Sequence, residues 1–422
     1  MEYKEKEIKT GIKLHEIKTE KFKTNLIAVF LTTELTRENV TKNAVISAIL
    51  RRGSQNLKTQ EEISKQMENL YGASFDCGLD KTGDNQVLKF YIETVNDTFL
   101  PTTNENILKT AIQNLLEIIF NPYTENEAFI KEYLEQEKNN IKQRIEGKKD
   151  NKAIYSLERC IQEMYQNEPF GLYKFGYIED LEKINEKNLY EYYKKLIDNC
   201  KIDIFVSGNI DDKTAEIIEN DENIKKLKSR NPKYNISKIE RKEIKKEKTI
   251  TDHLEVSQGK LVIGLDVDIE DENLKYDVLV YNCILGGTAN SKLFQNVREK
   301  AHLAYVASSS YLKHKNNIFI NCGIEISNYE KTLGLIKKQI EDIKNADFTN
   351  EEVENAKQGI IATIKTIDDE QDTTINYLFG QELATTKVSL EEYMKNIKKV
   401  KKEDVVNIAK KVNINTIYFL RD

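Results

Sequence analysis

The sequence predicts an α+β protein built from two similar halves, each a mostly antiparallel sheet with helices packed on one face. Two observations lead to this prediction. Strand-like segments come early in each half and helical segments then follow in runs, instead of alternating one by one. In addition, segments of the first half reappear in the same order in the second half, which indicates a repeated structural unit.

The clearest repeat is a helix that ends in glycine. Residues 38–53 read ENVTKNAVISAILRRG and residues 272–287 read ENLKYDVLVYNCILGG, so both open with Glu-Asn and close with Gly at the same spacing. Both place apolar residues at helical intervals. Each follows a strand-like segment, LIAVFLTT at 26–33 and KLVIGLDVDI at 260–269.

Two further pairs of segments support the repeat. Residues 123–145 and 348–364 each show a threonine N-cap signal, acidic residues and then a long helical pattern. Residues 187–208 and 402–420 each read as a helix followed by a strand. Between these segments the first half predicts a helix over 59–72 and a hairpin over 73–95, with a tight turn at Gly-Asp-Asn.

The repeat sets the expected domain boundaries. We predict a first domain over 1–210 and a second over 250–422. The stretch 211–249 is dense in charge and contains Pro232, which is typical of a solvated linker. A basic docking surface is the alternative interpretation of the same charges.

Composition excludes several classes of protein. The net charge is −6, and the 64 basic and 70 acidic residues are interspersed, so no clustered basic domain predicts nucleic-acid binding. The charged N-terminus predicts no signal peptide, and no apolar run is long enough to predict a membrane helix. The five cysteines are Cys77, Cys160, Cys200, Cys283 and Cys322. They have no CxxC spacing, which predicts reduced thiols and a cytoplasmic protein.

Two long strings resemble the insulinase (pitrilysin) family of zinc peptidases. Residues 286–311, GGTANSKLFQNVREKAHLAYVASSSY, resemble the signature of the family's second half, a double Gly followed by SRLF, REK and GLAY. Residues 166–211 resemble the family's stretch from a Pro–Gly segment to an apolar strand and Gly. The resemblance implies that the two halves form one half of a clamshell.

Active members of that family carry HxxEH on the first helix of the first half. Its two His are metal ligands on one helical face, its Glu is the base, and a Glu on a later helix completes the site. Here the resemblance places these positions at Ala44, Ser47 and Ala48, and the later Glu at Arg144. Alanine has no donor atom and Arg144 would oppose a metal cation. We therefore expect no metal, no cofactor and no catalysis by this chain alone.

A hidden metal site built from scattered His and Cys is the alternative. The chain has four histidines, and none forms an i, i+4 pair with another: His15, His253, His302 and His314. Because a catalytic zinc site needs about three protein ligands, each lone histidine is better interpreted as a surface or hydrogen-bonded residue.

The second-half string keeps Arg298 and, seven residues later, Tyr305. In the family this pair holds the substrate and stabilises developing negative charge at a metal site in the other half, so the resemblance implies a substrate-binding role. Gly286 and Gly287 would form the supporting turn that leads into the helix of Arg298. From the residues alone, a surface ion pair, a core tyrosine and a simple packing turn remain the alternatives.

The resemblance implies a division of labour. In two-subunit members of the family, one chain supplies HxxEH and the other supplies the Arg–Tyr pair, so we expect a heterodimer with an HxxEH-bearing paralogue, acting on a peptide or unfolded polypeptide. A binding or scaffold protein without a proteolytic role is the alternative. Residues 22–54 and 69–93 also resemble the metal-less member of a paired set in low-GC Gram-positive bacteria, which is associated with aminopentanol modification of elongation factor P.

Overall fold

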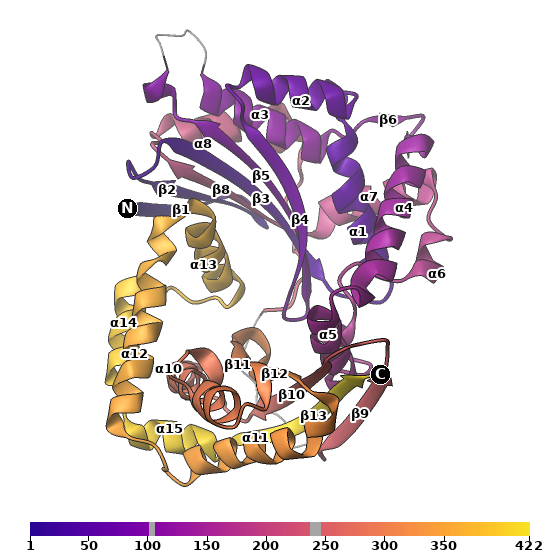
Figure 1. Ribbon diagram of the computed structural model, residues 1–422. Helices are drawn as coiled ribbons and strands as arrows, with labels where there is room; N and C mark the ends of the chain where they lie inside the picture. Colours follow the sequence, from indigo (N-terminus) through magenta and orange to yellow (C-terminus); the bar gives the residue numbers. More distant parts are fainter. Residues whose placement is uncertain (101–105, 237–245) are drawn as a thin grey trace. The chain divides into compact units, whose positions relative to one another are not determined.

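The computed structural model describes residues 1–100, 106–236 and 246–422. They divide into two compact units (Figure 1). The first unit comprises 1–146, 172–235 and 371–379, and the second comprises 147–171, 236–370 and 380–422. The fold class predicted from the sequence, α+β with mostly antiparallel sheets, is confirmed in both units.

The first unit contains a six-stranded sheet in the order β1-β2-β8-β3-β5-β4. Neighbouring strands are antiparallel except β2 and β8, which run parallel. The strands, in chain order, are β1 (Glu2–Lys9), β2 (Ile12–Lys18), β3 (Thr24–Glu34), β4 (Ser74–Thr82), β5 (Asn85–Val95) and β8 (Lys201–Gly208). The predicted strand at 26–33 and the hairpin at 73–95 are therefore confirmed.

Helices bury one face of this sheet. Alternating residues of β3, such as Ile27, Val29 and Leu31, pack into one apolar cluster with these helices, as expected for a strand with period-two side-chain directions. The helices are α1 (Val40–Ile49), α2 (Gln60–Asn69), α3 (Ile107–Phe120), α4 (Lys131–Glu146), α6 (Ile178–Leu181), α7 (Glu186–Asn199), α8 (Lys213–Glu219) and α9 (Glu222–Lys226).

The second unit repeats this plan with a five-stranded sheet in the order β11-β12-β10-β13-β9. Only the pair β13 and β9 is parallel among its described neighbours. The strands are β9 (Lys248–His253), β10 (Gly259–Val267), β11 (Ala304–Leu312), β12 (Asn317–Ile324) and β13 (Val412–Arg421). Its helices include α5 (Lys152–Met164), α10 (Lys275–Asn282), α11 (Tyr329–Lys344), α12 (Asn350–Lys365), α14 (Leu390–Lys399) and α15 (Lys402–Ala409).

Each half of the chain contributes one segment to the other unit. Helix α5 comes from the first half of the sequence but belongs to the second unit, whereas the first nine residues of α13 (Gln371–Leu383) belong to the first unit. The predicted boundaries at 210 and 250 did not include this exchange. Part of the predicted linker is also folded, because α8 and α9 bury Ile218 and Ile224. Residues 237–245 of that stretch lie outside the described residues.

One predicted helix start is wrong. Thr349 caps α12 as expected, in a capping box with Glu352. Thr124 does not cap α4, because it lies in the short strand β6 (Thr124–Glu125), which pairs with β7 (Ala128–Phe129). The intervening Asn126 and Glu127 both have positive φ, at 50° and 56°, which suits a two-residue hairpin turn. This turn delays the helix to Lys131.

Candidate functional site

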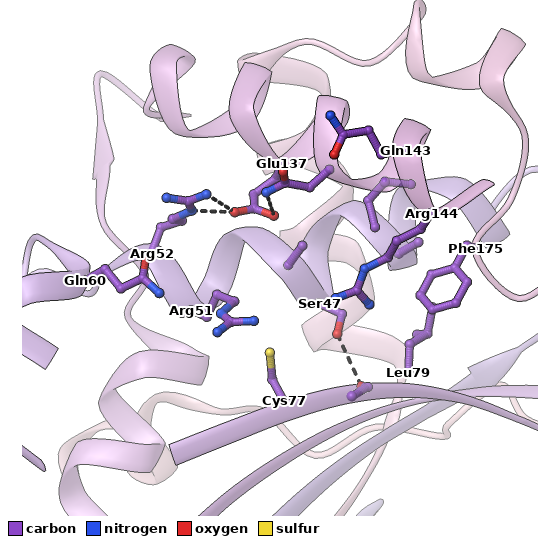
Figure 2. A pocket seen from close by; sticks show the side chains of 15 residues that line it. Ser47, Arg51, Arg52, Gln60, Cys77, Leu79, Glu137, Gln143, Arg144 and Phe175 are labelled. Atoms are coloured by element: carbon purple, nitrogen blue, oxygen red, sulfur yellow. Dashed lines mark hydrogen bonds and ion pairs between the residues drawn. The ribbon is translucent and has the colours of Figure 1, made fainter. Parts of the chain in front are cut away.

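Helix α1 directs one line of side chains toward α4 and β4. Ala44, Ser47 and Ala48 lie three and four residues apart and therefore share one face of the helix. Arg144 lies in the last turn of α4, which packs against α1. The four positions that the resemblance assigned to a lost metal site all line one cavity of about 530 Å³ in the first unit (Figure 2).

These four side chains make simple contacts. The Ser47 hydroxyl donates to the carbonyl of Gly78 on β4, at 3.2 Å. The guanidinium of Arg144 lies 5.5 Å from the centre of the Phe175 ring, a cation–π distance. Ala44 and Ala48 offer no donor atom. None of the four provides the imidazole or carboxylate that a catalytic zinc requires.

The cavity contains one carboxylate among its lining residues, and it is already paired. Glu137 on α4 is 5% exposed. It forms an ion pair with Arg52, and its second oxygen accepts a hydrogen bond from Asn140 at 3.2 Å (Figure 2). The ion pair fixes Glu137 as a structural carboxylate that joins the 3-10 turn after α1 (Leu50–Arg52) to α4.

Cys77 is the cavity's thiol, and burial raises the pKa of that thiol, against weaker opposing effects from cations such as Arg51. The thiol is therefore protonated near neutral pH and is neither a ready metal ligand nor a nucleophile. Among the described residues, no group of three or more His, Cys, Asp or Glu side chains is placed to hold a metal ion. The donor set present in the cavity does not fit zinc.

The histidines lie elsewhere. His15 is fully buried and its Nε2 lies 3.0 Å from Asp203 Oδ1. His253 Nδ1 lies 2.8 Å from the carbonyl of Asp422. Burial, and then Lys313, lower the pKa of His314 to about 4, so its ring is neutral. His302 adopts a φ of 53° just before β11.

In the second unit, Arg298 lies on a π-helix that spans Leu293–Lys300. Such wide turns are rare and occur often at functional sites. Its guanidinium lies 4.6 Å from the centre of the Phe294 ring, and its Nε lies 3.4 Å from the carboxylate of Glu299. The side chain is 44% exposed, so it is held on one side and open to solvent on the other.

Tyr305 lies at an irregularity of the edge strand β11. The register with β12 shifts between Ala304 and Val306, so Tyr305 is the extra residue of a β-bulge. Bulges re-aim side chains and interrupt strand alternation. Tyr305 is 65% exposed and the next residue, Val306, is 54% exposed. The expectation of a buried core tyrosine does not hold here, because the bulge turns the phenol outward.

The two predicted turn glycines differ. Gly286 is buried, and a Cβ on it would lie 2.6 Å from the backbone N of Ser309 on β11. The glycine therefore allows the π-helix Cys283–Gly287 to pack closely against β11. A Cβ on Gly287 would meet its nearest atom, the carbonyl of Asn282, at 3.3 Å, so the second position is far less restricted.

Sequence reasoning missed Arg51, Arg52 and Cys77 as cavity residues. The two arginines follow Ser47 and Ala48 by four residues each, so helical spacing alone would have placed them on the same face. Cys77 had no such signal, because its place depends on how β4 packs beneath α1.

Comparisons with known proteins follow the same lines. Residues 183–360 match the family model described as the peptidase M16 inactive domain. The chain is 33% identical to the "Probable inactive metalloprotease YmfF" of Bacillus subtilis, over 97% of this chain and 96% of the relative. It is 27% identical to the "Uncharacterized zinc protease YmxG" of the same organism, over 55% of this chain and 56% of the relative.

A solved structure shows the same fold. The crystal structure of a conserved protein from Enterococcus faecalis V583 matches with a TM-score of 0.89 and 28% identity, over 100% of this chain and 99% of that chain. Two α+β units of this design, with a cavity whose donor set does not fit zinc, together with these relatives define an inactive peptidase homologue. The chain belongs to the M16 peptidase family, the insulinase or pitrilysin family, as one of its inactive members.

The described residues contain no helix that is both long and apolar enough to span a membrane.

Proposed function

We propose that the chain is the non-catalytic subunit of a heterodimeric M16-type zinc peptidase. In this proposal, Arg298 and Tyr305 bind the substrate, and a partner that carries HxxEH provides the metal site at which the substrate is cleaved. The observation that carries this proposal is the local backbone: the arginine lies on a π-helix and the tyrosine on a bulge, and both side chains are open to solvent.

The chemistry of the pair suits a peptide substrate. A guanidinium and a phenol are fixed hydrogen-bond donors, and both can stabilise a carbonyl oxygen that gains negative charge. The ion pair of Arg298 with Glu299 is exposed, and exposed pairs contribute little free energy. A substrate oxygen can therefore replace Glu299 at small cost. The substrate class that we propose is a peptide or an unfolded polypeptide.

The relatives support the existence of such pairs. Bacillus subtilis contains both a relative named as a probable inactive metalloprotease and a relative named as a zinc protease. We propose that an analogous zinc-bearing paralogue is the partner of this chain. Four cysteines are free and buried, namely Cys160, Cys200, Cys283 and Cys322. Free thiols support a reducing compartment, and we propose the cytoplasm.

The test is co-purification followed by peptide cleavage. The chain should be tagged and purified with its HxxEH-bearing paralogue, and the complex assayed for peptide cleavage. We expect Arg298→Ala to lower kcat/KM by about a hundredfold, the scale seen when one oxyanion donor is removed. Lys300→Ala is the matched control, because this cation lies on the same π-helix and its ammonium bonds Asn296.

Full cleavage by the Arg298→Ala complex would rule out the shared site. Failure to find any HxxEH-bearing partner would instead favour the alternative, a binding or scaffold protein that keeps the peptidase fold.

We also propose a link to elongation factor P, which rests on the resemblance of residues 22–54 and 69–93 to the metal-less member of the paired set. Deleting the gene should change the mass of elongation factor P isolated from the cells by the mass of an aminopentanol modification or part of it. An unchanged mass would contradict the link without affecting the proposed heterodimer.

A further inference from the structure

The cavity of the first unit has an excess of positive charge. Three guanidinium groups line it, from Arg51, Arg52 and Arg144, together with one carboxylate, Glu137. Because Glu137 is paired with Arg52, it does not compensate the other two arginines. Within residues 1–100, 106–236 and 246–422, neither Arg51 nor Arg144 forms an ion pair with an acidic side chain.

The other polar groups of the cavity do not remove this excess. The Cys77 thiol is kept neutral by burial, which raises its pKa. Ser47 donates its proton to Gly78. The acidic neighbour Asp76 belongs to the opposite face of β4, because successive strand residues alternate. Figure 2 shows the side chains of Arg51 and Arg144 extending into the space between the helices and β4.

The cavity also has an apolar part. Leu79, Ile141 and Phe175 line it beside the two arginines. Its volume of about 530 Å³ lies within the range of pockets that hold a small organic ligand or a few side chains. Two permanently charged guanidinium groups next to apolar walls suit a singly charged organic anion better than a fully hydrated inorganic one.

We propose that this pocket binds a carboxylate group of a peptide, held by Arg51 and Arg144, with the adjoining apolar side chain against Leu79, Ile141 and Phe175. The carboxylate is either an acidic side chain or a peptide C-terminus. The pocket thus selects an anion at the positions that the resemblance assigns to a metal in active relatives. The inference is independent of the proposed heterodimer, because the pocket lies within one unit of this chain and is tested with the chain alone.

The test uses three peptides of one sequence, N-acetyl-Ala-Leu-Xaa-Leu-Ala. The first has Glu at Xaa and an amidated C-terminus, the second has Gln and an amidated C-terminus, and the third has Gln and a free C-terminus. Binding to the full chain is measured by isothermal titration calorimetry at low salt. We expect the first or the third peptide to bind at least about tenfold more tightly than the second, and the winner identifies the source of the carboxylate.

Variants locate the site. Arg51→Gln and Arg144→Gln should each weaken the preferred peptide by about tenfold, and the double variant more. Both arginines are at least partly exposed and lack acidic partners, so circular dichroism should show that the variants fold. Lys142→Gln is the matched control, because it removes a cation from the same helix outside the cavity.

Three results would overturn the proposal. They are equal or absent binding of the three peptides, an equal loss of affinity in Lys142→Gln, and tighter binding of a phosphoserine peptide of the same sequence.

Discussion

At the scale of single residues, two adjacent arginines in the 3-10 turn that follows α1 (Leu50–Arg52) have different environments. Arg52 pairs with the buried carboxylate of Glu137, and its own side chain is 20% exposed. Arg51 lines the same cavity without an acidic partner among the described residues. Both lie at a helix C-terminus, where a cation is favoured by the helix dipole. The difference between them is therefore the ion pair to α4.

This contrast gives the first stability prediction. Arg52→Ala should lower the free energy of unfolding by about 2 kcal/mol, because it leaves Glu137 buried without a cation, and partial exposure of the arginine reduces the full cost. Arg51→Ala should change it by less than about 0.5 kcal/mol. Urea denaturation of the two variants measures both values, and equal losses would contradict the structural role given to Arg52.

Single residues also show which parts of the cavity could be predicted from the sequence and which could not. Resemblance selected Ala44, Ser47, Ala48 and Arg144, and the structure brings all four to one cavity, although their relation to a lost metal site stays a prediction. Arg51 was within reach, since it follows Ser47 by one helical turn. Cys77 was not, because only the packing of β4 under α1 brings it there.

At the scale of elements, a polar cluster that is buried except for Tyr3 joins three neighbouring strands of the first sheet. Tyr3 on β1 places its hydroxyl 2.7 Å from His15 Nδ1 on β2, and His15 Nε2 lies 3.0 Å from Asp203 on β8. Asp203 also pairs with Lys201, which is 8% exposed. His15 stacks on Phe205, with ring centres 4.2 Å apart. The cluster fixes the register of the parallel pair β2 and β8.

Asp203 makes this cluster sensitive to acid. Burial raises the pKa of its carboxyl, but Lys201 and then His15 lower this pKa by more than burial raises it. The net pKa therefore lies below the ordinary value. A depressed folded-state pKa means that the stabilisation is present above the unfolded-state pKa and is lost as the pH falls through the folded-state value. The window therefore lies below about pH 4.

We expect Asp203→Asn to cost about 3 kcal/mol at pH 7, because it removes the negative charge from a buried ion pair with Lys201. The difference from the unmodified chain should narrow as the pH falls below about 4. Urea denaturation between pH 7 and pH 3 measures it. Glu191→Gln, at an exposed position of α7, serves as the control and should show no such narrowing. A gap that stays constant with pH would refute the assignment.

Element boundaries show a second limit of sequence reasoning. Thr124 and Thr349 precede similar helical patterns, yet Thr349 alone of these two caps a helix. Asparagine tolerates positive φ, so Asn126 offered a turn signal, but Glu127 with a φ of 56° gave none. The residues after Thr124 therefore gave too weak a turn signal to predict a two-residue hairpin.

At the scale of the whole molecule, the repeat extends to the exchanged segments. Phe379 of α13 packs on Phe30 of β3, with ring centres 4.8 Å apart, in the first unit. In the repeat register that aligns Glu38 with Glu272, Phe30 aligns with Gly264 of β10. A Cβ on Gly264 would overlap the sulfur of Met164, which comes from α5. The first sheet thus packs on α13 through the Phe30 ring. The second sheet packs on α5 at Gly264, where the lack of a side chain leaves room for Met164.

The exchange predicts that each unit depends on the other half of the sequence. Phe379 and Met164 are each 3% exposed, so Phe379→Ala and Met164→Ala should each cost roughly 2–5 kcal/mol locally. Phe379→Ala should speed hydrogen exchange in β3 and β8, since its ring contacts Phe30 and lies 6.4 Å from Phe205. Met164→Ala should instead speed exchange in β10 and β12, the strands of Gly264 and its neighbour Phe319.

Hydrogen–deuterium exchange with peptide-level mass spectrometry separates the two patterns, and each variant is the control for the other. When helix packing is weakened in one unit, we expect local opening in that unit, because the protection of backbone amides from exchange follows the cooperative unit to which a strand belongs. If the domain boundaries followed the chain order, Phe379→Ala would loosen β10 and β12, and Met164→Ala would loosen β3 and β8. That reversed pattern would show that the division into exchanged units is incorrect.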